Sequence, residues 1–186
     1  TGNKVSYRTP TVNNCWAEAS VGLHGKANNP VGKVNKNAYD LAANYNNGPL
    51  SLGAGYSYWN SNYQAAVRGL YTFGQFTVGA YYQRNKDDNA ILGAGAGSRN
   101  NFRLSGMYVL NASDFHVNVG RANSWRQVDD SAATQWTLGY TYNLPKRTKV
   151  YTYYTRINNG GNARYGDVSA AGNDFSSFAV GVRHNF

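Results

Sequence analysis

The chain has 186 residues, with 18 Lys and Arg against nine Asp and Glu, a net charge of +9 and 15% aromatic residues. That aromatic content excludes a disordered chain, and no run of about 18 apolar residues is long enough for a transmembrane helix. A single cysteine, Cys15, excludes a disulfide-stapled scaffold and a cysteine-based zinc site. The length fits one domain, so we treat residues 1–186 as one unit.

Apolar residues alternate with polar or small ones along most of the chain, which predicts β-strands rather than helices. Phe178, Val180 and Val182, for example, alternate with small and charged residues. In chain order, the alternating stretches are 4–8, 15–24, 38–45, 50–58, 64–73, 76–83, 102–110, 115–120, 135–142, 150–155 and 178–186. The first stretch is marginal, so we predict ten clear strands and one marginal strand in an all-β fold.

The connections between these stretches alternate in length. Short turns rich in Gly, Pro, Asn and Asp are predicted at 46–49, 73–75, 111–114 and 144–147. Longer polar connections are predicted at 26–37, 85–100, 123–133 and 158–173, and only the connection at 60–62 is short where a long one is due. This alternation is typical of an antiparallel transmembrane β-barrel, with the last residue on the short-turn side.

The two faces of the predicted strands differ in a way that favours a membrane. Alternation alone also fits a soluble antiparallel sandwich. Here, however, one face is polar or glycine along nearly all strands, while the other carries aromatic residues near strand ends, such as Tyr45, Phe76 and Tyr108. Only a closed barrel satisfies the backbone in lipid. Since bacterial single-chain barrels have even strand numbers, we expect eleven strands to be part of a longer barrel.

Four segments resemble the general trimeric porins of the Gram-negative outer membrane, in that family's order. They are NKVSYRTP at 3–10, YNNGPL at 45–50, LGYTYNLPKRT at 138–148 and AVGVRHNF at 179–186. The resemblance implies a sixteen-stranded, water-filled barrel of which residues 1–186 are the C-terminal part. It further implies a homotrimer in the outer membrane of a Gram-negative bacterium that passes small hydrophilic solutes and ions passively. No enzymatic activity and no cofactor are expected.

Several charged residues have the polar-face parity and are predicted to line the channel. The basic ones are Arg68, Arg103, Arg183, His116 and Lys149, the acidic ones are Glu18 and Asp40, and Tyr81 shares this face. Because Arg and Lys in a channel wall favour anions, we predict a mild anion preference. The alternative is that these arginines pair with carboxylates elsewhere in the barrel and only solubilise its wall.

Three further arginines, Arg84, Arg121 and Arg156, have the lipid-facing parity at the ends of strands that run toward the long connections. We predict that they lie at one height on the outer rim and bind lipopolysaccharide phosphates, because Arg recognises phosphate through paired hydrogen bonds. The alternative is that they are solvated rim charges. Phe186 has the same parity, and the resemblance implies that this terminal aromatic is part of the signal for barrel assembly.

Two other functions remain open. One is a soluble or surface all-β binding module. The other is a substrate-specific sugar channel, in which Trp16, Trp59 and Tyr81 form a stacking track. The three histidines are far apart without metal-ligand spacing, no nucleophile and base stand together, and the positive charges are too scattered for a nucleic-acid surface.

Overall fold

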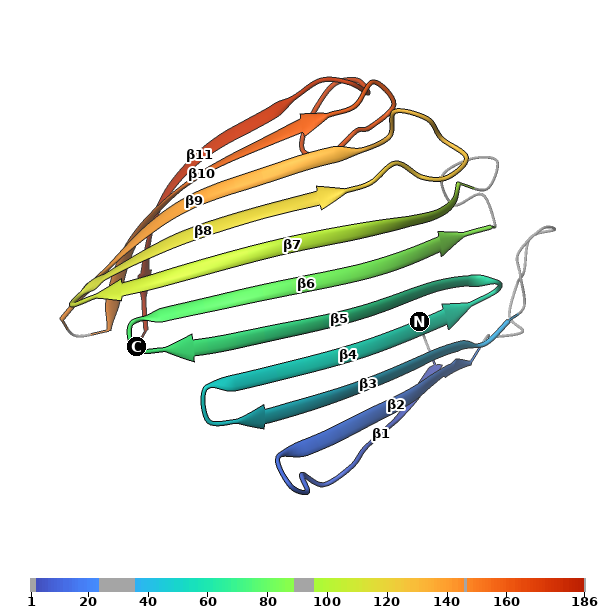
Figure 1. Ribbon diagram of the computed structural model, residues 1–186, viewed down its shortest axis with the longest axis horizontal. Helices are drawn as coiled ribbons and strands as arrows, with labels where there is room; N and C mark the ends of the chain where they lie inside the picture. Colours follow the sequence, from blue (N-terminus) through green and yellow to red (C-terminus); the bar gives the residue numbers. More distant parts are fainter. Residues whose placement is uncertain (1–2, 24–35, 89–95, 146, 186) are drawn as a thin grey trace.

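The computed structural model describes residues 3–23, 36–88, 96–145 and 147–185, which form one curved antiparallel sheet (Figure 1). Its strands are β1 (Asn3–Arg8), β2 (Cys15–Leu23), β3 (Ala38–Asn47), β4 (Leu50–Trp59), β5 (Asn62–Phe73), β6 (Phe76–Asp87), β7 (Gly97–Leu110), β8 (Ser113–Ala122), β9 (Ala133–Leu144), β10 (Thr148–Asn159) and β11 (Phe175–His184). The predicted all-β antiparallel fold is confirmed, including the marginal first strand. Within these residues, no helix has the length and apolar character needed to cross a membrane.

Each strand pairs with the next one along the chain, so the sheet is a simple meander from β1 to β11. Figure 1 shows the short turns after β3, β5 and β7 at the left of the view, and the longer connections after β8 and β10 at the right, together with the tight turn between β4 and β5. The edge strands β1 and β11 both run from the long-connection side to the short-turn side. Because they run in the same direction, they could not pair with each other as antiparallel neighbours, and closure into a sixteen-stranded barrel stays an expectation.

One face of the sheet is apolar and exposed. Val117, Leu138 and Val180 expose 47%, 52% and 66% of their surface, and Val117 and Leu138 are direct partners in the β8–β9 ladder. In the described part of the chain, the only buried hydrophobic residues are alanines, and no large side chain is fully buried. A soluble sheet protein would cover such a face with a second apolar layer. The absence of a core among these residues favours the predicted lipid-facing wall.

Aromatic rings form two belts on this apolar face. On the short-turn side, neighbouring rings lie with their centroids 4.5 to 6.4 Å apart in the series Phe73, Phe76, Tyr108, Phe115 and Tyr140, in which the last pair is tilted and the others are stacked. Toward the long connections, three pairs of rings contact across neighbouring strands: Tyr56 and Tyr63, Tyr82 and Phe102, and Trp136 and Tyr154. Two aromatic belts that flank an apolar band are typical of a barrel that crosses a bilayer.

The strands extend further toward the long-connection side than the alternation predicted. β6 ends at Asp87 and β7 begins at Gly97, so the predicted connection at 85–100 was wrong at both ends. Residues such as Arg84, Asn85 and Lys86 are polar on both faces, and the alternation signal disappears although strand pairing continues.

The short connection predicted at 60–62 is confirmed as a tight turn, in which Asn60 and Ser61 have φ angles of 47° and 68°. Most of the predicted 26–37 connection and the terminal Phe186 lie outside the described residues.

Candidate pore-lining surface

A row of directly paired residues crosses the polar face of the sheet, which we call the inner face. In this row, Arg68 of β5 pairs with Tyr81 of β6, and Tyr81 pairs with Arg103 of β7. The ladder thus brings together three of the residues that the sequence predicted to line the channel. They border a hollow of about 590 Å³, and no described carboxylate lines it.

The guanidinium groups of this row keep their positive charge uncompensated. The Nη2 atom of Arg68 donates a hydrogen bond to the amide oxygen of Asn44, at 3.0 Å. Neither Arg68 nor Arg103 forms an ion pair with any carboxylate in the described part of the chain. A neutral amide accepts a hydrogen bond without cancelling the charge, so this row is a positively charged stretch of wall.

Tyr81 separates the two arginines and begins a polar chain along β6. Its hydroxyl donates to the side-chain oxygen of Gln83, and the amide nitrogen of Gln83 donates to Asn85. These side chains share the inner face with the arginines. The wall next to the hollow therefore offers hydrogen-bonding groups to water and to polar solutes.

Arg99 adds a further cation to this surface, and sequence reasoning missed it. It lies near the start of β7, on the same face as Arg103. Its guanidinium lies 4.3 Å from the centre of the Trp125 ring and 5.5 Å from that of Tyr165, and it donates a hydrogen bond to the Tyr165 hydroxyl. The predicted connection at 85–100 includes this residue, whereas counting the parity back from Arg103 places it on the inner face.

The two connections that contact Arg99 are also joined to each other. The amide of Gly161 donates to the Asp130 carboxylate at 2.7 Å, and the amide of Gly160 donates to the Ala132 carbonyl at 2.8 Å. The connection between β8 and β9 and the one between β10 and β11 therefore form one hydrogen-bonded unit. Trp125 and Tyr165 bring this unit against the inner face.

The predicted acidic residues lie apart from the arginine row. Asp40 of β3 lies 3.5 Å from the Lys4 ammonium and accepts a hydrogen bond from Ser20 at 3.1 Å. Glu18 of β2 is the direct ladder partner of Arg8. Both carboxylates thus have a basic neighbour on β1, and neither of them lines the hollow that the arginine row borders.

The remaining predicted basic residues form separate groups nearer the short turns. His116 contacts Tyr153, with ring centroids 6.1 Å apart. Lys149 and Arg183 are direct partners across β10 and β11, and both are exposed. The predicted set is therefore divided into an arginine row in the middle, an acidic pair at one edge and a basic pair near the turns. Nowhere in the described residues do three His, Cys, Asp or Glu side chains gather in a way that could hold a metal ion.

Arg84, Arg121 and Arg156 lie on the opposite, apolar face. Each is the ninth residue of its strand, counted from the short-turn end of β6, β8 and β10. At about 3.3 Å per residue and a tilt of roughly 40°, that position lies about 20 Å above the first residue, close to the far edge of an apolar band about 25 Å tall. The prediction that the three share one height is consistent with this register.

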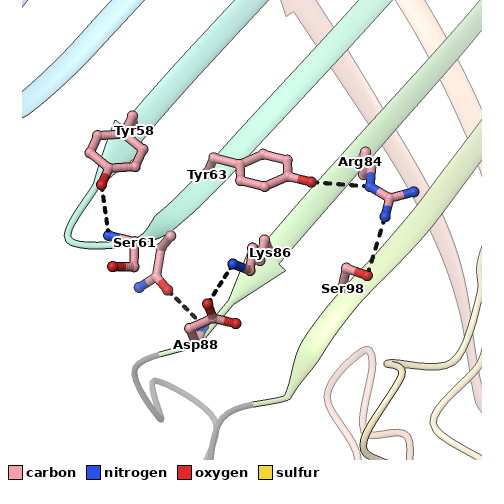
Figure 2. Close-up of polar contacts among 8 residues, drawn as sticks. Tyr58, Ser61, Tyr63, Arg84, Lys86, Asp88 and Ser98 are labelled. Carbon is pink, nitrogen blue, oxygen red and sulfur yellow. Dashed lines mark hydrogen bonds and ion pairs between the residues drawn. The ribbon is translucent and has the colours of Figure 1, made fainter.

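The surroundings of the three arginines differ. Figure 2 shows Arg84 between Tyr63 and Ser98, whose hydroxyls accept its hydrogen bonds at 3.1 and 3.5 Å. Nearby, Lys86 pairs with Asp88 at 2.5 Å.

Arg121 bonds only to neutral groups among the described residues, Asn123 and Thr134, both at 3.3 Å. Arg156 instead forms an ion pair with Asp174 at 3.1 Å, which the sequence pattern did not indicate.

Comparison with known proteins adds to this geometry. A family model described as Gram-negative porin matches residues 1–162. Among solved structures, an anion-selective porin from Comamonas acidovorans superimposes with a TM-score of 0.79 at 24% identity, covering 99% of this chain. The outer membrane protein OmpT of Vibrio cholerae superimposes with a TM-score of 0.69 at 17% identity, and its in-vitro folded trimer form with 0.65 at 16%, each covering 97% of this chain. No curated protein sequence matches the chain.

The chain spans only part of these structural relatives. It covers 59% of the Comamonas porin and 64% of each of the two OmpT structures. At these identities the likeness concerns the fold alone.

Proposed function

Because the chain belongs to the Gram-negative porin family, we propose that it forms part of the wall of a water-filled channel for small hydrophilic solutes and ions. The family and the outer membrane of a Gram-negative bacterium, both predicted from the sequence motifs, are confirmed. The observation that carries the proposal is the two-faced sheet, apolar and exposed outside, polar and positively charged inside. Such a wall is suited to separating lipid from a water-filled lumen.

A mild anion preference is the finer part of this proposal. It is supported by the hollow that Arg68, Arg99 and Arg103 border without a carboxylate. One structural relative is itself described as an anion-selective porin. Fixed positive charges in a channel wall raise the local concentration of anions and lower that of cations. The preference is mild because mobile salt screens wall charges over about 8 Å.

The test is electrical. The protein is inserted into planar lipid bilayers, and the reversal potential is measured in a KCl gradient. We expect conductance that rises with salt without saturating and a reversal potential whose sign indicates chloride as the more permeant ion. An inserted protein that passes no current would refute the channel, whereas a cation-selective current would refute only the anion preference.

The sugar-channel alternative has less support in the structure. The Arg8 guanidinium covers the Trp16 ring at 3.7 Å, and Trp59 lies at the long-connection end of β4. The row that contains Trp16 and Tyr81 is occupied between them by Asn44, Gly53 and Arg68, so these rings do not form a continuous track. Saturable conductance that maltose blocks would favour this alternative. Recovery of the protein in buffer without detergent would favour a soluble module.

We also propose that the protein assembles as a homotrimer. The support is the family, together with a structural relative that is described in a trimer form. Chemical crosslinking in detergent, followed by denaturing electrophoresis, should give a ladder that ends at three subunits. A ladder that ends at one subunit would exclude the trimer.

The outer rim suggests a membrane partner, and we propose that Arg84 and Arg121 bind phosphate groups of lipopolysaccharide. Both lie on the apolar face at the same strand position and have only neutral hydrogen-bond partners among the described residues. Both are therefore available to an anion that lies at the membrane surface. Arg156 occupies the corresponding position, but its ion pair with Asp174 lowers its affinity for a further anion.

This difference supplies a matched control. Arg84→Ala with Arg121→Ala should lower retention of the protein on lipopolysaccharide vesicles by on the order of tenfold, while Arg156→Ala changes it much less. Phosphatidylcholine vesicles, whose phosphates are balanced by choline, measure binding that does not need a net negative surface, and competition with inorganic phosphate separates a free anion from the lipid. Equal retention of the double variant and the parent would remove the proposal.

A further inference from the structure

Glycines on the inner face lie directly opposite long side chains. Gly53 pairs with Arg68, Gly139 with Tyr153, and Gly181 with Tyr151. In each pair, a Cβ atom added to the glycine would overlap the long side chain. These side chains therefore lie across the neighbouring strand instead of pointing away from the wall.

Arg68 lies across β4 in this way and reaches toward β3. A Cβ atom on Gly53 would lie 2.7 Å from the Nε atom and 3.2 Å from the Cγ atom of Arg68, so the middle of the side chain passes directly over the glycine. The guanidinium then reaches Asn44 on β3, whose side-chain oxygen accepts its hydrogen bond at 3.0 Å. Since neighbouring strands are about 4.8 Å apart and the Nε atom lies over Gly53, the charge lies roughly 5–7 Å from β5, beyond β4 and toward β3.

The backbone gives no other reason for a glycine at this position. The φ angle of Gly53 lies outside the left-handed region, and glycine within a strand is otherwise destabilising. Gly55, two residues further along β4 and on the same face, behaves differently, because the nearest atom to an added Cβ is the Leu41 carbonyl oxygen at 3.8 Å. A methyl group fits at Gly55, whereas at Gly53 it would displace Arg68.

We propose that Gly53 and Asn44 are positioning residues that hold Arg68 flat against the wall and so set the width and the ion preference of the channel. The inference rests on the channel function proposed above. A side chain at residue 53 lifts the guanidinium off β4 and moves it toward the solution that fills the lumen. The distance between a passing anion and the Arg68 guanidinium then becomes shorter, and the open cross-section of the channel at this level is reduced.

The test compares four variants with the parent in planar bilayers: Gly53→Ala, Gly55→Ala, Arg68→Ala, and Gly53→Ala combined with Arg68→Ala. Gly53→Ala should lower the single-channel conductance and raise the anion-to-cation permeability ratio about twofold near 0.15 M salt, as for a charge that moves from about 8 Å to about 5 Å from the ion path. Gly55→Ala should match the parent. Arg68→Ala should lower the ratio, and the combined variant should behave like Arg68→Ala.

The outcomes separate this inference from the channel itself. A conducting parent with an unchanged Gly53→Ala variant refutes the inference and leaves the channel standing. A combined variant that keeps the low conductance of Gly53→Ala also refutes it, because the effect would then not pass through Arg68. A parent that inserts without conducting refutes both. If Gly53→Ala does not fold, Asn44→Ala carries the test, since it releases Arg68 without adding atoms and should raise the permeability ratio in the same direction.

Discussion

Removal of the two arginines that flank Tyr81 is the most direct test of the charged wall. Arg68 and Arg103 lie one strand to either side of Tyr81 in the same row, and neither pairs with a described carboxylate. We therefore expect the combined change Arg68→Ala and Arg103→Ala to remove two uncompensated charges from one level of the channel. The hydrogen-bonded strands themselves are left unchanged.

The expected size follows from simple electrostatics. In water, an ion about 8 Å from one guanidinium interacts with it by roughly 0.5 kcal/mol, and salt with a Debye length of about 8 Å reduces this to roughly 0.2 kcal/mol. Each arginine attracts an anion and repels a cation, so it changes their relative free energy by roughly 0.4 kcal/mol. Two arginines should therefore change the permeability ratio by about fourfold near 0.15 M salt.

The assay is the reversal potential in KCl gradients, measured near 0.15 M and again near 1 M. At about 1 M the Debye length falls to about 3 Å, so the change in permeability ratio should shrink to less than about 1.3-fold. A ratio that stays unchanged at low salt would show that these arginines do not act on passing ions. A change of equal size at both salt concentrations would show that the substitutions alter the pore shape instead of its charge.

Three further predictions concern the wall. Leu104→Arg, on the apolar face, should lower the free energy of unfolding in lipid vesicles by about 2–4 kcal/mol, whereas Ser105→Arg on the inner face should be nearly neutral; equal urea transitions would contradict the assigned faces. In a Cys15→Ala background, Ser105→Cys should react quickly with a water-soluble thiol reagent and Leu104→Cys slowly, and reversed rates would contradict the two-sided wall. In Gly139→Ala, the added methyl group should overlap the Tyr153 ring and lower the free energy of unfolding by about 1–3 kcal/mol. Thermal unfolding in detergent measures this change, and an unchanged melting temperature would show that the ring moves freely.

Much of the fold could be predicted because the side-chain period of a strand is two. Alternation placed Leu138 and Val180 on one face and Arg103 on the other without any knowledge of strand pairing. Gly48 marks a turn in the sequence, and its positive φ of 52° shows the backbone conformation for which glycine is suited. Prediction failed beyond the apolar band, where β6 and β7 continue with polar residues on both faces.

The site itself depends on relations that strand parity cannot supply. The alternation along each strand predicted that Arg68, Tyr81 and Arg103 share a face. Only the register between the strands places them in one row. The ion pair between Arg156 and Asp174 and the stacking of Arg99 between two connections depend on irregular backbone with no period to read.

For this protein, then, the sequence by itself determined the strands, their two faces and the porin family, because these follow from local periodicity and short motifs. The tertiary structure alone decided which charged side chains form ion pairs among the described residues, which do not, and which lie against the wall. The physical reason is that charge and hydrogen-bond partners are set by distances of a few ångströms between strands. Those distances depend on register and on side-chain direction, as the placement of Arg68 over Gly53 shows.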